Sequence, residues 1–65
     1  MPIIRVEMLK GRTIEQKRAL VDKVTAGFVE SCGGNPDKIY VMIEEVEAEN
    51  WGVGGQLLSD KSANQ

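Results

Sequence analysis

Two short apolar segments, separated by one long amphipathic segment, constrain the fold of this chain more than any other feature. The first segment, residues 3–9, is rich in branched side chains and places Ile4, Val6 and Met8 on one face at a spacing of two. Residues 39–46 alternate in the same way. Both segments are therefore predicted to be β-strands.

The segment between them shows the signals of an α-helix. Thr13 and Gln16 match a capping box, in which each side chain accepts a hydrogen bond from the backbone amide of the other residue. Gly33-Gly34 supplies a C-terminal cap, and Asn35-Pro36 prevents the helix from continuing. The predicted buried stripe of the helix, in which the cysteine is expected to be a buried small hydrophobe, consists of Leu20, Val21, Val24, Phe28 and Cys32.

This order of elements predicts the fold class. Two strands joined by a helix of about five turns form a β-α-β unit with parallel strands and a right-handed crossover. Residues 47–50 are expected to be a polar loop, and the glycine-rich residues 52–55 suit a tight hairpin. The tail, residues 59–65, is expected to be frayed and flexible. The prediction is one α+β domain over residues 1–65.

The predicted sheet has more apolar surface than one helix can cover. Ile39, Val41 and Ile43 share one face of the second strand, whereas Tyr40 and Met42 lie on the other. The single cysteine cannot form an intrachain disulfide, and no Cys/His cluster is present to bind a structural metal. A chain of 65 residues buries only a small core. We therefore expect a homo-oligomer whose subunits cover the second face.

Charge and hydropathy argue against nucleic-acid binding and against a membrane location. Eight Lys and Arg against ten Asp and Glu give a net charge of -2 without a basic run, so nucleic-acid binding is not expected. No apolar stretch approaches the roughly 20 residues of a membrane span, and the start of the chain lacks a signal-peptide pattern. We expect a cytoplasmic protein that does not associate with membranes.

Met1-Pro2 offers a base in a chain that contains no histidine. A small residue at position two permits removal of Met1, which leaves Pro2 with a free secondary amine. With Met1 attached, the Pro2 nitrogen belongs to a tertiary amide and has no basicity. An ordinary α-amine titrates at about 7.7–8.0, and a free proline is more basic. Apolar walls or a nearby cation would lower the pKa of this amine toward the working pH of a general base.

Three groups of residues together resemble a known family. They are Met1-Pro2-Ile3, the segment Gly11-Arg12-Thr13 followed by Glu15-Gln16-Lys17, and Trp51-Gly52-Val53-Gly54-Gly55. Their joint occurrence, at matching spacing over residues 2–58, resembles the 4-oxalocrotonate tautomerase family. The resemblance implies a β-α-β subunit with a C-terminal hairpin, a hexamer or related homo-oligomer, a small-molecule carboxylate substrate, and no metal or organic cofactor.

The resemblance also implies roles for individual residues. Pro2 matches the catalytic proline that moves a proton between an enol oxygen and carbon, and Arg12 matches an arginine that binds a substrate carboxylate. Trp51 matches the aromatic wall of the pocket. Tyr40 stands where members of the family carry a second arginine, so the chain departs from the pattern there. Tyr40 can donate one hydrogen bond to an enolate oxygen but brings no charge. We therefore expect weaker binding of a second carboxylate, or a mono-acid substrate such as an enolised aryl-pyruvate.

Several alternatives stay open at the level of sequence. Lys38, Arg5 or a backbone amide near Leu9 are the candidates for replacing the missing arginine. Arg12 is also interpretable as a solvated turn residue, and Tyr40 as an interface residue. A non-catalytic scaffold with the same fold is the main alternative function. Dehalogenase or hydratase chemistry ranks lower, because residues 52–54 contain no acid to activate water.

Overall fold

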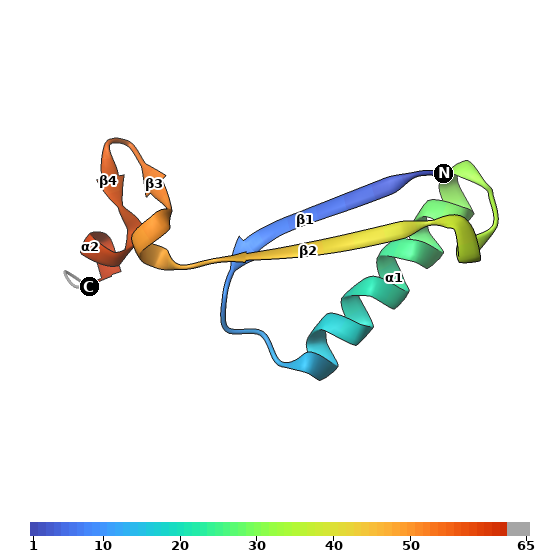
Figure 1. The fold of residues 1–65 in the computed structure, drawn as a ribbon, viewed down its shortest axis with the longest axis horizontal. Coiled ribbons are helices and arrows are strands. Elements are labelled where there is room, and N and C mark those ends of the chain that lie inside the picture. Colours follow the sequence, from blue (N-terminus) through green and yellow to red (C-terminus); the bar gives the residue numbers. More distant parts are fainter. Residues whose placement is uncertain (63–65) are drawn as a thin grey trace.

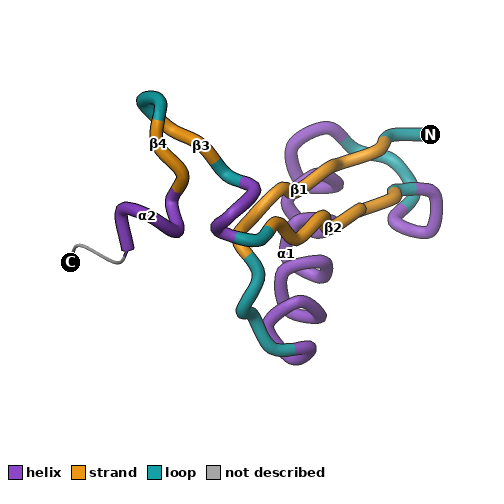
Figure 2. Tube along the Cα trace, turned by 60° about the vertical axis from the view of Figure 1, so that its left-hand side comes forward, coloured by secondary structure: helices purple, strands orange, loops and turns teal. Residues whose placement is uncertain are grey.

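The computed structural model describes residues 1–62, and the order of its main elements confirms the β-α-β prediction. Strand β1 (Ile3–Leu9) pairs in parallel with β2 (Tyr40–Val46), in a register that runs from Ile3 opposite Tyr40 to Leu9 opposite Val46. Helix α1 (Ile14–Cys32) connects the two strands and lies along one face of the pair (Figures 1 and 2). The fold class is therefore α+β, as predicted.

Both ends of α1 form as the sequence predicts. The Thr13 hydroxyl accepts from the Gln16 amide at 3.1 Å, and the Gln16 side chain accepts from the Thr13 amide at 2.8 Å. At the other end, Gly33 has φ 80 and donates its N–H to the Val29 carbonyl at 2.8 Å. A φ in this region favours glycine, because a side chain would be strained there. The capping box and the glycine therefore fix the helix length.

The stripe of α1 that faces the sheet differs in part from the prediction. Leu20, Val24 and Phe28 are half-buried, as expected, but Val21 is 36% exposed and Cys32 is also exposed. Val21 lies on the flank of the helix, about 100° around the axis from Leu20. Cys32 is the last residue of α1 and borders an open hollow, so no strand covers its thiol. The prediction of a buried cysteine is wrong for this subunit.

The face of the sheet opposite α1 is uncovered. Ile3 is 61% exposed, Tyr40 52% and Met42 50%, and their side chains alternate with the half-buried ones that contact the helix. No described residue is fully buried in the single chain. The subunit therefore leaves apolar surface in water that larger proteins bury.

The C-terminal part forms a small unit beyond the end of the sheet. Strands β3 (Gly52–Val53) and β4 (Gln56–Leu57) pair in an antiparallel hairpin, with Gly54 and Gly55 at φ 60 and 84 in its turn. Two positive φ values in succession explain the glycine pair. Figure 1 shows this hairpin projecting along the long axis, away from α1, in a molecule that measures 45 × 24 × 15 Å.

Three short helical segments lie in parts of the chain where the sequence predicts no helix. One 3₁₀ turn, η1 (Pro36–Lys38), precedes β2, and another, η2 (Ala48–Asn50), occupies the expected loop. Helix α2 (Leu58–Ser62) begins the tail and contacts η2 and β4. Its first N–H donates to the Trp51 carbonyl at 2.8 Å, which ties the start of the helix to the hairpin. Residues 59–62 of the expected tail are therefore helical, and residues 63–65 lie outside the described part.

We expect Thr13→Ala to destabilise each chain by about 0.5–2 kcal/mol, because the Gln16 amide loses its acceptor at the helix start. Thr13→Ser is the matched control and should stay within a few tenths of a kcal/mol of the parent. Urea unfolding followed by circular dichroism, at one protein concentration, measures both changes. Equal stability of the alanine and serine variants would contradict the capping role.

Candidate active site

Pro2 lies at the start of the sheet and is anchored through its carbonyl. The Tyr40 amide donates to that carbonyl at 3.0 Å, which joins the entry of β1 to the entry of β2. Met1 precedes Pro2 and is 80% exposed. In this form of the chain the Pro2 nitrogen is acylated and carries no proton. The backbone that positions Pro2 does not depend on that nitrogen.

An open hollow of about 560 Å³ borders Pro2. It lies between the start of β1, the end of α1 and the turn η1, and most of its wall is apolar or glycine. Its lining residues are Met1, Pro2, Phe28, Cys32, Gly33, Gly34, Asn35, Lys38 and Ile39. The hollow is large enough for a small carboxylic acid, and Pro2 is part of its wall.

Arg12 lies at the opposite end of β1. Its Nη1 donates to the Leu9 carbonyl at 3.1 Å, and its side chain is exposed. A strand of seven residues spans about 20 Å, so β1 separates Arg12 from Pro2 by roughly that length. Figure 1 shows the N-terminus and the loop after β1 at opposite ends of the sheet. A single chain therefore does not bring these two predicted site residues together.

The remaining predicted site residues divide between the same two ends. Tyr40 begins β2 beside Pro2, with its side chain on the uncovered face of the sheet. Leu9 ends β1 beside Arg12. Trp51 is half-buried and follows η2, beyond the end of β2. Pro2 and Tyr40 thus form one group, while Leu9 and Arg12 lie near the hairpin end of the sheet with Trp51.

Two ion pairs hold the loop that contains Arg12. The Lys17 ammonium lies 2.5 Å from a Glu45 oxygen, and Lys10 lies 2.9 Å from Glu47. The hydrogen bond from Lys17 lowers the pKa of Glu45 below its ordinary value. The hydrogen bond to Glu47 raises the pKa of Lys10. Sequence analysis missed these pairs, although Lys10 and Glu47 directly follow the paired ends of β1 and β2.

The comparisons with known proteins identify the family. A family model described as tautomerase enzyme matches residues 2–61. The chain belongs to the tautomerase family. A 2-hydroxymuconate tautomerase of Bacillus subtilis is 50% identical over 60 residues, which cover 92% of this chain and 97% of that protein. A probable tautomerase of Halalkalibacterium halodurans is 48% identical over 61 residues, covering 94% of this chain and all of that protein (100%).

Solved structures of the same kind share the fold of this tautomerase. A 4-oxalocrotonate tautomerase isozyme from Methylibium petroleiphilum superposes with a TM-score of 0.94 at 36% identity, over 98% of this chain and 100% of that one. A homologue of 4-oxalocrotonate tautomerase superposes with a TM-score of 0.88 at 49% identity, over 91% of this chain and 97% of that one. This chain is therefore an isomerase of the 4-oxalocrotonate tautomerase type.

Two kinds of feature are absent from the described residues. Among them, no cluster of three or more His, Cys, Asp or Glu side chains is arranged to bind a metal ion. No helix within the same residues combines the length and the apolar character that crossing a bilayer requires.

We expect Glu45→Gln to lower the thermal midpoint of this tautomerase at pH 7, because the charged partner of Lys17 is lost. The folded-state pKa of Glu45 lies below its ordinary value of 4.5. Its contribution to stability is therefore present above that value and disappears as the pH falls through the folded-state pKa. Midpoints of parent and variant should converge in acid. Glu44→Gln is the control, since Glu44 is in no ion pair with the described residues, and a constant difference at all pH values would contradict the assignment.

Proposed function

We propose that this tautomerase converts an enol form of a carboxylic acid to its keto form, with Pro2 as the proton carrier after removal of Met1. The position of Pro2 supports this most directly, because Pro2 borders an open hollow and is preceded by one residue that is 80% exposed. An aminopeptidase of the cytoplasm can reach that residue. The proposal therefore places the working enzyme in the cytoplasm.

The proposed reaction needs one base that becomes an acid. The neutral amine of Pro2 takes the proton from the enol oxygen, and the oxygen electrons form the carbonyl. The electron pair of the carbon–carbon double bond moves to the far carbon, which receives a proton from the Pro2 ammonium. The amine is regenerated, and all atoms balance. Such a positioned acid–base group typically contributes about 10²–10⁴-fold to the rate.

Arg12 is proposed to bind the substrate carboxylate. Its planar guanidinium donates two parallel hydrogen bonds to a carboxylate, which orients the substrate, and its positive charge attracts the carboxylate. The relatives named 2-hydroxymuconate tautomerase support a 2-hydroxydienoate as the substrate class, and an enol-pyruvate acid is the alternative. Leu9 and Trp51 are proposed to supply the pocket wall beside Arg12, and Tyr40 a neutral donor beside Pro2.

The distribution of these groups supports a homo-oligomeric enzyme. Pro2 and Arg12 lie at opposite ends of β1, so a site that contains both needs residues from at least two chains. The exposed apolar side chains of Ile3, Tyr40 and Met42 supply surface for such contacts. We propose a hexamer, in which every Pro2 faces an Arg12 of another subunit.

A non-catalytic scaffold is the second candidate function. The neutral Tyr40 in place of a second arginine favours it, because a binding site with less charge holds a dianion less well. Retention of Met1 in the native protein would also favour it. Dehalogenation or hydration is less well supported, since Gly52, Val53 and Gly54 offer no carboxylate.

We expect the mass of the native protein to show loss of Met1, and Pro2→Ala to lower kcat/KM by about 10²-fold or more. The alanine variant keeps an amino terminus but replaces the secondary ring amine. Ketonisation of 2-hydroxymuconate and phenylenolpyruvate, followed by ultraviolet absorbance, measures the change. Retained Met1, or unchanged rates in the variant, would overturn the proposed role of Pro2.

We expect Arg12→Ala to raise KM and lower kcat, with a loss of about 10–100-fold in kcat/KM, because a charged hydrogen-bond partner of the substrate is removed. Arg12→Lys should recover part of the loss. Arg18→Ala is the control, since Arg18 is on α1 and borders a different hollow. Unchanged kinetics in Arg12→Ala would show that Arg12 is only a surface residue.

A further inference from the structure

The hollow beside Pro2 contains one charged side chain. Among the described residues that line it, Lys38 has the one charged side chain, and Met1 carries the N-terminal ammonium before processing. Lys38 forms no ion pair with a described residue, whereas Lys10 and Lys17 are each paired with a glutamate. A cation beside apolar walls attracts an anion more strongly than a cation in open water. The hollow therefore has a cationic side chain in its wall that can attract an anion.

The backbone holds Lys38 close to Pro2. The Lys38 N–H donates to the Asn35 carbonyl at 2.9 Å, which closes the turn η1. Two residues later, the Tyr40 N–H donates to the Pro2 carbonyl at 3.0 Å. Lys38 is thus two positions from the hydrogen bond that anchors Pro2. Its flexible stem, which ends in three donors, can direct the ammonium toward an anion in the hollow.

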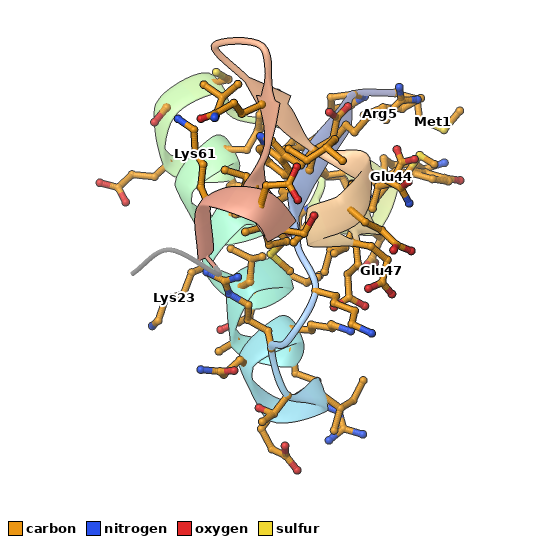
Figure 3. All side chains as sticks on the ribbon, turned by 90° about the vertical axis from the view of Figure 1, so that its left-hand side faces the viewer. Met1, Arg5, Lys23, Glu44, Glu47 and Lys61 are labelled. Carbon is orange, nitrogen blue, oxygen red and sulfur yellow. The ribbon has the colours of Figure 1, made fainter. Side chains whose placement is uncertain are left out.

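The other two candidates for replacing the missing arginine lie elsewhere. Leu9 is at the far end of β1. Arg5 is exposed and lies opposite Met42 in the sheet, on the face that α1 does not cover. Figure 3 shows Arg5 and Glu44 on the side of the molecule away from α1. Within one chain, neither Arg5 nor Leu9 lines the hollow that Pro2 borders, whereas Lys38 does.

We infer that Lys38 is a specificity-determining residue that binds the second carboxylate of a dicarboxylate substrate. This inference rests on the proposed function, in which Arg12 of another subunit binds the first carboxylate and Pro2 moves the proton. Lys38 would supply the charge that Tyr40 lacks, from a position two residues earlier in the chain. The substrate class then narrows from carboxylic acids in general to enols with two carboxylates.

Two unreactive ligands isolate this role from catalysis. trans,trans-Muconate and sorbate share the same diene geometry and differ at one end, which is a carboxylate in muconate and a methyl group in sorbate. The ratio of their Kd values therefore reports the site for the second carboxylate. In the processed protein, muconate should bind more tightly than sorbate. Lys38→Gln should weaken muconate by about tenfold or more while changing sorbate by less than about twofold. Titration calorimetry of the intact oligomer measures both.

Matched variants separate charge from folding. Lys38→Arg should keep muconate within about threefold of the parent, since it restores the cation. Lys23→Gln removes the same charge from the outer part of α1, as Figure 3 shows, and should leave both Kd values unchanged. An unchanged ratio in Lys38→Gln, or a parent that does not prefer muconate, would overturn the inference and identify Lys38 as a solvated lysine. Failure of the proposed function would appear separately, as activity that survives Pro2→Ala.

Discussion

One helix covers only one face of the two-stranded parallel sheet and leaves the other face exposed to solvent. The other features of the subunit depend on this exposed face. No described residue is fully buried, and Ile3, Tyr40 and Met42 present at least half of their surface to water. An isolated pair of strands is too small to be stable without further packing. The proposed site residues Pro2 and Arg12 lie at the two distant ends of this single short sheet.

Each end of the sheet has its own contacts that hold the residue proposed for the site. Pro2 is fixed by a backbone hydrogen bond to Tyr40, and the loop that contains Arg12 is fixed by the pairs Lys17–Glu45 and Lys10–Glu47. Fixed groups spend little binding energy on ordering when a substrate arrives. Under the proposed function, each subunit presents two half-sites that form before assembly, and assembly brings half-sites of different subunits together.

The sequence predicts the elements well because the signals for them are local. Spacing of two defines β1 and β2, and the capping box and Gly33 define α1. The misses, in contrast, depend on what lies beyond a segment. Cys32 fits a helical stripe but extends past the strands that would cover it, and the start of α2 is held by a hydrogen bond from the Leu58 N–H to the Trp51 carbonyl. For the site, residue types and family resemblance named Pro2 and Arg12 as candidates, and the predicted strand over residues 3–9 already lies between them. The selection of Lys38 needed the geometry of the turn before β2.

The anchoring of Pro2 through its carbonyl has a consequence for the maturation of the enzyme. Proline has no amide hydrogen to donate, so excision of the residue before it breaks no hydrogen bond of the sheet. Under the proposed chemistry, the newly made polypeptide is a minimal proenzyme, in which folding and activation are separate events. The cut that activates it converts an acylated nitrogen to an amine and leaves the architecture as it was.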